Sequence, residues 1–134
     1  FMTAKTTIDM PSFVASPGDS LPGTVEEQFN VGLSYDYAMG SRPAYTRLDY
    51  LYYGDSYATF GQSEDQMSPA YEKFNFNWGV ELNENSTLQL SIDNLMDNRT
   101  EAFKFSADSP GWRPRNYLQW IPPRSVSLRY TYRY

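Results

Sequence analysis

The stretch that decides the fold is RSVSLRYTYRY, residues 124–134. Its even positions from Val126 to Tyr134 are all apolar or aromatic, and its odd positions from Ser125 to Arg133 are all polar or charged. Successive side chains of a β-strand point to opposite faces, so this period of two predicts a strand with one apolar and one polar face. We also expect the chain to end inside its own structure here rather than in a tail.

Four other segments show the same alternation. It is unbroken in residues 29–37 and 74–82 and short in residues 88–92, and in residues 44–53 it is interrupted at Leu51. No segment has a helical period. The sequence therefore predicts an all-β fold, an antiparallel up-and-down meander of about five strands.

Composition excludes several classes of protein. The 134 residues are 17% aromatic, and no apolar run approaches the roughly 20 residues that a membrane helix needs, although the strands of a membrane barrel are not excluded. Eleven basic residues against 16 acidic ones argue against a nucleic-acid partner. The absence of Cys and His removes disulfides, thiol catalysis, and the commonest general base and metal ligand.

The connections between the five segments alternate in length. Residues 38–43 and 83–86 form short connections, whereas residues 54–69 and 96–123 form long ones. Alternate connections of an antiparallel meander lie on the same side, so one rim has tight turns and the other has long loops. This asymmetry is typical of outer-membrane barrels, whose short turns are periplasmic. It predicts that residues 124–134 run inward and end at the periplasmic rim.

Short motifs at these positions resemble a known family. They are LPG at 21–23, YGDSY at 53–57, DNLMDN at 93–98, where Met96 replaces the usual Phe, and PR at 123–124. In order and spacing they resemble the C-terminal portion of a TonB-dependent outer-membrane receptor, over roughly residues 21–134.

The resemblance implies a larger protein. Members of this family close a transmembrane β-barrel of about 22 strands around an N-terminal plug. They import scarce ligands such as iron-siderophore chelates, cobalamin or oligosaccharides with energy passed through TonB. By resemblance, residues 1–24 are an extracellular loop segment and residues 25–134 are the last five strands, in a bacterial outer membrane. The plug and the TonB box would lie upstream. The implied partners are the rest of the barrel and its plug, the barrel-assembly machinery, TonB and the lipid bilayer.

The barrel geometry assigns each strand residue to a face. The expected lipid face consists of Phe29, Val31, Leu33, Phe74, Phe76, Val80, Leu88, Leu90, Ile92, Val126 and Leu128. The expected aromatic girdles at the membrane interfaces consist of Tyr35, Tyr37, Tyr50, Tyr52, Trp78, Tyr130, Tyr132 and Tyr134. The expected lumen face consists of Asn30, Ser34, Asp36, Arg47, Asp49, Asn75, Asn77, Glu81, Gln89, Ser91, Asp93, Ser127, Arg129, Thr131 and Arg133.

Two groups of residues are candidate functional sites. Aromatic and Arg side chains in the longest loop suit an anionic or sugar-like ligand, although they could equally pack that loop on its neighbours; they are Trp112, Arg113, Arg115, Tyr117 and Trp120. The apolar positions of the last strand resemble the signal read by the barrel-assembly machinery: Val126, Leu128, Tyr130, Tyr132 and Tyr134. Residues 63–66 form an acidic tip that is more typical of a solvated loop than of a cation site. We find no candidate catalytic, cofactor-binding or metal-ligating residues, and we expect no enzyme.

Three other interpretations stay open. The first is another outer-membrane barrel, such as a porin or adhesin. The second is a soluble β-barrel or sandwich that binds a small ligand, in which the apolar face points inward. Alternation alone does not separate an apolar core from a bilayer. The third is an enzyme, which would need a carboxylate pair that the sequence does not supply, since Asp93 and Asp97 fall on a strand and in a loop.

Overall fold

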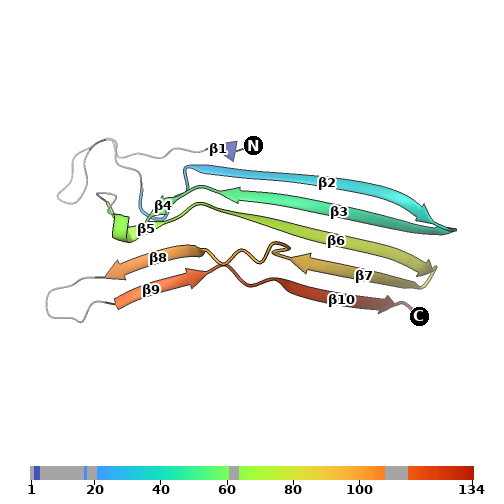
Figure 1. The fold of residues 1–134 in the computed structure, drawn as a ribbon. Helices are drawn as coiled ribbons and strands as arrows, with labels where there is room; N and C mark the ends of the chain where they lie inside the picture. Colours follow the sequence, from blue (N-terminus) through green and yellow to red (C-terminus); the bar gives the residue numbers. More distant parts are fainter. Residues whose placement is uncertain (1, 4–16, 18–20, 61–63, 108–114) are drawn as a thin grey trace. The chain divides into compact units, whose positions relative to one another are not determined.

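The structure is a computed structural model that describes residues 2–3, 17, 21–60, 64–107 and 115–134 (Figure 1). It is all-β, and its one helical element among the described residues is a single 3₁₀ turn, η1 (Glu64–Gln66). The chain forms two compact units. We call Asn30–Leu51, Glu72–Asn98 and Pro122–Tyr134 the strand unit, and Phe1–Phe29, Tyr52–Tyr71 and Arg99–Ile121 the loop unit.

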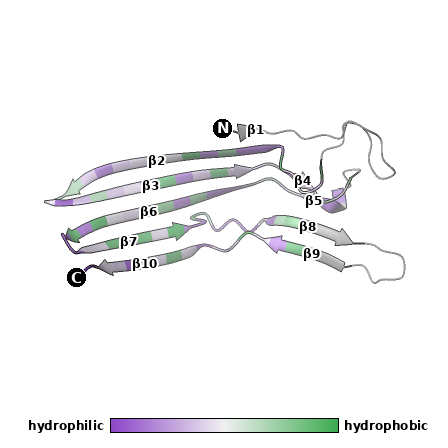
Figure 2. Cartoon of the chain, turned by 180° about the vertical axis from the view of Figure 1, so that it is seen from behind, coloured by the Kyte–Doolittle hydropathy of each residue, from purple (hydrophilic) through white to green (hydrophobic). Residues whose placement is uncertain are grey.

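Five long strands form an antiparallel sheet in the order β2-β3-β6-β7-β10, and the short β1 (Met2–Thr3) pairs with the start of β2. The five strands are β2 (Glu27–Met39), β3 (Arg42–Tyr53), β6 (Tyr71–Asn83), β7 (Ser86–Asp93) and β10 (Ser125–Tyr132). They confirm the predicted meander of five strands, in the predicted order and within a few residues of the predicted bounds. The alternation of apolar and polar residues along them is visible in Figure 2.

Two tight turns join neighbouring strands. The turn between β6 and β7 was predicted over residues 83–86 and consists of Glu84 and Asn85, and the Asn85 backbone N–H donates to Asn83 Oδ1 at 3.0 Å. The turn between β2 and β3 was predicted as six residues but consists of Gly40 and Ser41 alone. Gly40 has φ of +70°, a conformation that glycine adopts without steric cost, so the strands can continue up to the turn.

The two long connections, which were predicted as long loops, each contain a hairpin that the sequence prediction did not include. The first contains a short hairpin of β4 (Ser56–Tyr57) and β5 (Met67–Ser68). The second contains a hairpin of β8 (Glu101–Ala107) and β9 (Arg115–Trp120). β5 and η1 contact β8, and the Lys104 N–H donates to Ser68 Oγ at 2.9 Å. The long connections thus fold on one another within the loop unit.

Candidate functional site

The register of β6, β7 and β10 brings apolar side chains into rows. Residues directly opposite each other in an antiparallel pair share a face. The three rows that cross these strands are Phe76–Ile92–Val126, Trp78–Leu90–Leu128 and Val80–Leu88–Tyr130. The intervening rows are polar, as in Asn77–Ser91–Ser127. The predicted division of these strands into an apolar and a polar face is therefore confirmed.

Side-chain contacts extend the apolar face to β2 and β3. Trp78 Nε1 donates to the hydroxyl of Tyr37 at 2.8 Å, which places Tyr37 of β2 on the Trp78 side of the sheet. Tyr37 stacks with Tyr35, their ring centroids 5.6 Å apart. On β3, Tyr50 packs against Phe74 with a centroid distance of 4.9 Å. We call this surface, built from the odd positions of β2 and the even positions of the other four strands, the apolar face.

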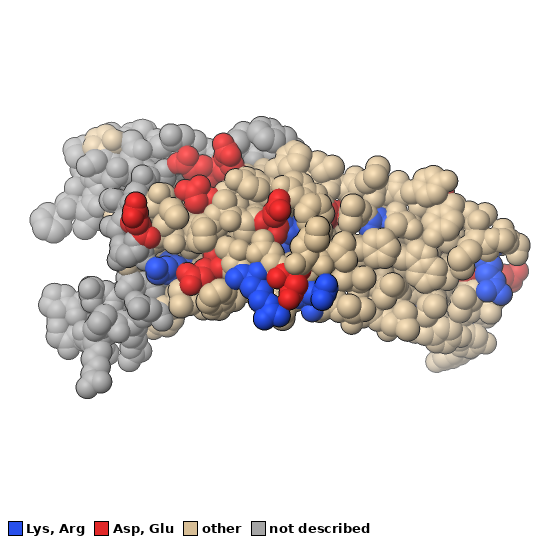
Figure 3. Space-filling view, viewed as in Figure 1, with Lys and Arg blue, Asp and Glu red and all other residues tan. Residues whose placement is uncertain are grey.

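The apolar face is not covered by a second layer within the described part of the chain. Side chains that normally form a core are largely exposed: Leu33 is 71% exposed, Leu128 69% and Val126 64%. Among the described residues, the buried hydrophobic ones are Ala44, Val80 and Ile121. On the face turned to the viewer in Figure 3, charged side chains are almost absent over the turn-bearing halves of the strands, except at the turns themselves. The sheet is therefore a single layer with an apolar surface left open.

The polar face is organised by two glycines, a feature that the sequence prediction missed. The ring of Tyr45 lies over Gly79, where an added Cβ would be 2.8 Å from Tyr45 Cζ. Tyr45 thereby reaches across β6, and its hydroxyl accepts a hydrogen bond from Gln89 Nε2 at 3.3 Å. In the same way Gly32 leaves room for Asp49, whose carboxylate accepts two hydrogen bonds from Arg47 Nε at 2.9 and 3.0 Å. A glycine inside a strand pattern was the available signal, because it marks close approach by another group.

A shallow hollow of about 300 Å³ opens on this polar face. Polar-face side chains from four strands surround it: Asp36, Tyr45, Glu81, Thr87 and Gln89. Two carboxylates and three neutral polar groups make it hydrophilic. These are the side chains that we expected to face a lumen, with the addition of Tyr45 and Thr87.

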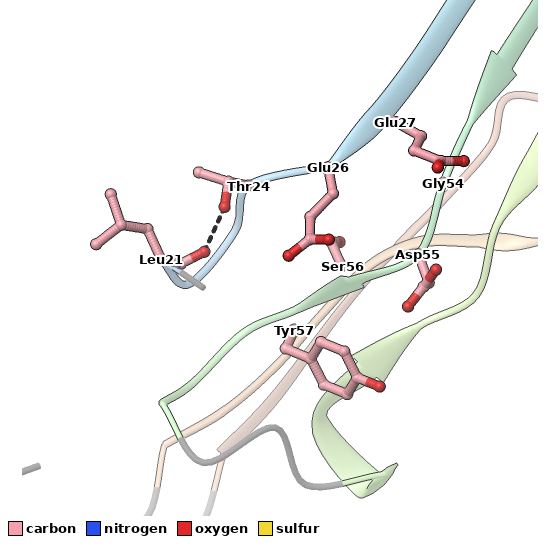
Figure 4. Close-up of a pocket in the computed structure, with 8 residues that line it drawn as sticks. All are labelled: Leu21, Thr24, Glu26, Glu27, Gly54, Asp55, Ser56 and Tyr57. Carbon is pink, nitrogen blue, oxygen red and sulfur yellow. Dashed lines mark hydrogen bonds between the residues drawn. The ribbon is translucent and has the colours of Figure 1, made fainter. Parts of the chain in front are cut away.

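A second hollow, of about 390 Å³, lies in the loop unit (Figure 4). Its lining includes three carboxylates, Glu26, Glu27 and Asp55, and its walls are tied by hydrogen bonds from Gly54 N–H to the Glu27 carbonyl and from Gly23 N–H to the Tyr57 carbonyl. Even so, no group of three or more His, Cys, Asp or Glu residues in the described part of the chain is placed to hold a metal ion.

The structure describes only part of the predicted set of ligand-contact residues. Trp112 and Arg113 lie outside the described residues, and Arg115 begins β9. Tyr117 and Trp120 both belong to β9 and are 52% and 54% exposed. Because they are three positions apart in one strand, they point to opposite faces of the hairpin. Of the acidic tip, Ser63 is outside the described residues and Glu64 begins η1.

The residues predicted as an assembly signal lie together. Val126, Leu128, Tyr130 and Tyr132 occupy alternate positions of β10 on the apolar face and are all more than half exposed. Tyr134 follows the strand and is fully exposed. Among the described strands, β10 has a neighbour only on its β7 side.

Comparison with protein-family models, with curated proteins and with solved structures gives no significant match to this chain. Among the described residues, no helix has the length and apolar character needed to cross a membrane. The functional interpretation therefore depends on the two faces of the strand unit and on the residue motifs.

Proposed function

We propose that this chain forms part of the wall of a bacterial outer-membrane β-barrel, with the apolar face toward lipid. The observation that carries the proposal is the open apolar face. Complete burial of a Leu or Val side chain is worth roughly 1.5–3 kcal/mol. A face that leaves Leu33, Val126 and Leu128 mostly exposed needs an apolar partner, and a bilayer supplies one along its whole length.

Strand length supports a membrane wall. The three longest strands, β2, β3 and β6, contain 13, 12 and 13 residues, and β7 and β10 contain eight each. At about 3.3 Å per residue, a strand of 13 residues is roughly 43 Å long, and at a tilt of about 45° it spans about 30 Å. This equals the thickness of the hydrocarbon core of a typical bilayer. Strands of globular proteins are usually about half as long.

The distribution of aromatic residues on the apolar face gives further support. Toward the tight turns lie Tyr35, Tyr37, Tyr130 and Tyr132, and toward the long connections lie Phe29, Tyr50, Tyr52 and Phe74; Trp78 lies one row further from the turn than Tyr130, in the row of Leu90 and Leu128. Aliphatic residues predominate between these two groups: Val31, Leu33, Leu48, Leu90, Ile92, Val126 and Leu128. An apolar band with an aromatic girdle at each end is the pattern of a transmembrane barrel. Tyr and Trp suit the interface because one part of each ring is apolar and one is polar.

Within this class, the TonB-dependent receptors are our specific proposal. The turn asymmetry and the motifs at 53–57, 93–98 and 123–124 support it. In this interpretation the polar face, with Arg47, Asp49 and the hollow beside Tyr45, lines the lumen toward the plug. Residues 1–24 and the two hairpins would belong to the extracellular loops, and the five long strands within residues 25–134 to the wall. The full protein would import a scarce ligand such as an iron chelate, cobalamin or an oligosaccharide, without catalysing a reaction.

The orientation of the sheet is tested by single cysteines, since the chain has none of its own. In the full-length protein freed of any other cysteine, Leu128→Cys and Leu90→Cys probe the apolar face, and Ser127→Cys and Ser91→Cys are the matched controls on the polar face. Each variant is labelled with a fluorophore and reconstituted with nitroxide-bearing lipids. We expect strong quenching at positions 90 and 128 and weak quenching at 91 and 127. Equal quenching on both faces, or folding without any lipid or detergent, would instead indicate a soluble sheet.

The receptor class has its own test. The full-length protein should bind the purified C-terminal domain of TonB. A variant of the full-length protein that lacks the upstream TonB box should not bind it. A protein that passes the quenching test but does not bind TonB would be another kind of outer-membrane barrel, such as a porin or adhesin.

A further inference from the structure

One asparagine in the strand unit is more deeply buried than any other large side chain in the described residues. Asn94 follows β7 and is 1% exposed. Its φ is +52°, in the left-handed region that Asn adopts more readily than most residues. Its backbone N–H donates to Asn75 Oδ1 at 3.1 Å, and the next N–H, of Leu95, donates to the Phe74 carbonyl at 2.7 Å. Asn94 is thus held against β6 by its own backbone and by that of its neighbour.

The side chain of Asn94 joins two points that are distant in sequence. Its Nδ2 donates to the Asn98 carbonyl at 2.8 Å and to the Pro122 carbonyl at 2.9 Å, and its Oδ1 accepts from the Asn98 N–H at 2.9 Å. Both amide hydrogens and the amide oxygen are therefore used. Asn98 is the last residue before the chain enters the loop unit, and Pro122 is the first residue after it returns. One buried amide binds both ends of the excursion 99–121.

A second set of bonds fastens the same place. The Arg124 N–H donates to Asp97 Oδ1 at 2.9 Å, and Arg124 Nη1 reaches the Leu95 carbonyl at 3.4 Å. On the other side, Asn98 Nδ2 donates to the Glu72 carbonyl at 3.0 Å. Residues 94–98 are thus bonded to the start of β6 and to the residues that enter β10. None of these bonds uses a residue of the excursion itself.

We propose that Asn94, with Asn98 and Pro122, forms a clasp that makes residues 99–121 an exchangeable module. The clasp joins the two ends of the module through bonds of the strand unit, and the module adds a closing bond of its own, from the Ile121 N–H to the Thr100 carbonyl at 3.1 Å. We expect the strand unit to close without that second bond. The free-energy cost of closing a loop grows only slowly with its length, so a closed base tolerates long or short insertions. The module presents exposed side chains of the β8–β9 hairpin, among them Tyr117 and Trp120.

The first test replaces residues 99–121 of the full-length protein with a Gly/Ser linker of about six residues. The strand unit should fold as before, with its folding equilibrium constant changed by no more than about tenfold, the scale that loop length sets. Failure of this variant to fold would overturn the proposal, because the strands would then depend on the excursion.

The second test removes the amide and keeps the backbone. Asn94→Gly suits a φ of +52° and deletes the three side-chain hydrogen bonds. In hydrogen exchange by mass spectrometry, peptides from residues 98–107 and 115–122 should exchange on the order of 100-fold faster, as expected for local opening. Peptides from β6, β7 and β10 should stay protected. Asn94→Asp, which keeps one acceptor but loses both donors, should show the same local effect.

The matched control is Asn85→Gly, because Asn85 Nδ2 also donates to a single distant carbonyl, that of Arg133 at 2.9 Å. This change should leave exchange in the module unaltered. Two results would overturn the clasp: an Asn94→Gly protein that does not fold, or one whose exchange rises equally across β6, β7 and β10. Neither readout depends on whether the apolar face meets lipid, so a failure here is distinct from a failure of the barrel proposal.

Discussion

The two faces of the strand unit differ in how their side chains are held. On the polar face, Arg47, Asp49 and Tyr45 make specific contacts with neighbouring side chains, and glycines make room for them. On the apolar face, Val31, Leu33, Val126 and Leu128 project with much of their surface open. Side chains that make specific polar contacts suit a face that meets another folded part of a protein. Apolar side chains that make few contacts suit a face that meets a fluid apolar solvent. Substitutions that are matched across the sheet can therefore separate the two environments.

The largest expected difference comes from placing a charge at adjacent positions of β7. Leu90 lies on the apolar face in the row Trp78–Leu90–Leu128, and Ser91 lies on the polar face between Asn77 and Ser127. In lipid near the midplane, Leu90→Arg should destabilise the full-length protein by about 2–4 kcal/mol. Ser91→Arg should cost much less, since a water-lined face solvates the charge. Denaturant titration of folding into vesicles measures both values, and equal costs would contradict the assignment of the faces.

The next effect is steric and belongs to the polar face. Gly79→Ala would place a Cβ against the ring of Tyr45, which must move, and such overpacking costs typically about 1–3 kcal/mol. The same change in a Tyr45→Ala background should cost little, because the ring is gone. A double-mutant cycle of unfolding free energies measures this coupling. Additive effects of the two changes would show that Tyr45 does not rest on Gly79.

A smaller effect is expected for the hydrogen bond that links β6 to β2 across the apolar face. Trp78→Phe removes the donor Nε1 and leaves the Tyr37 hydroxyl with the long hydrogen bond that Thr46 Oγ1 donates to it at 3.5 Å. We expect a loss of about 0.5–1.5 kcal/mol, the usual net value of one hydrogen bond. Tyr37→Phe should have a similar effect, and the double variant should lose no more than either one. The unfolding free energies of the three variants test this directly.

The smallest effect is expected at the ion pair of Arg47 and Asp49. The Arg47 side chain is 50% exposed and that of Asp49 is 16% exposed, so water and salt reach the pair from the Arg47 side and screen it. Asp49→Asn keeps the shape of the side chain and should leave the unfolding midpoint unchanged within error at moderate ionic strength. A clear loss of stability would place this pair in a dry contact with another part of the protein.

What the sequence by itself determined is the set of five strands and their two faces. Alternation such as Ser127-Leu128-Arg129 is a local property, because the backbone of a strand turns each side chain to the opposite side from its neighbour. The tight turn at Glu84 and Asn85 was likewise readable from residues next to each other. The β2–β3 turn was predicted too long because Ala38 and Met39 still belong to β2, and Arg42 and Pro43 already belong to β3.

What only the tertiary structure decided depends on contacts between residues far apart in the chain. The β8–β9 hairpin pairs Lys104 with Leu118. The periodicity of a single segment does not predict which residue of another segment pairs with it. Tyr45 meets Gly79 and Gln89 only because the register of three strands brings them together. Asn94 binds the carbonyl of Pro122, 28 residues away. Periodicity says which way a side chain points, but register and loop closure decide what it meets, and these follow from the free energy of the whole sheet.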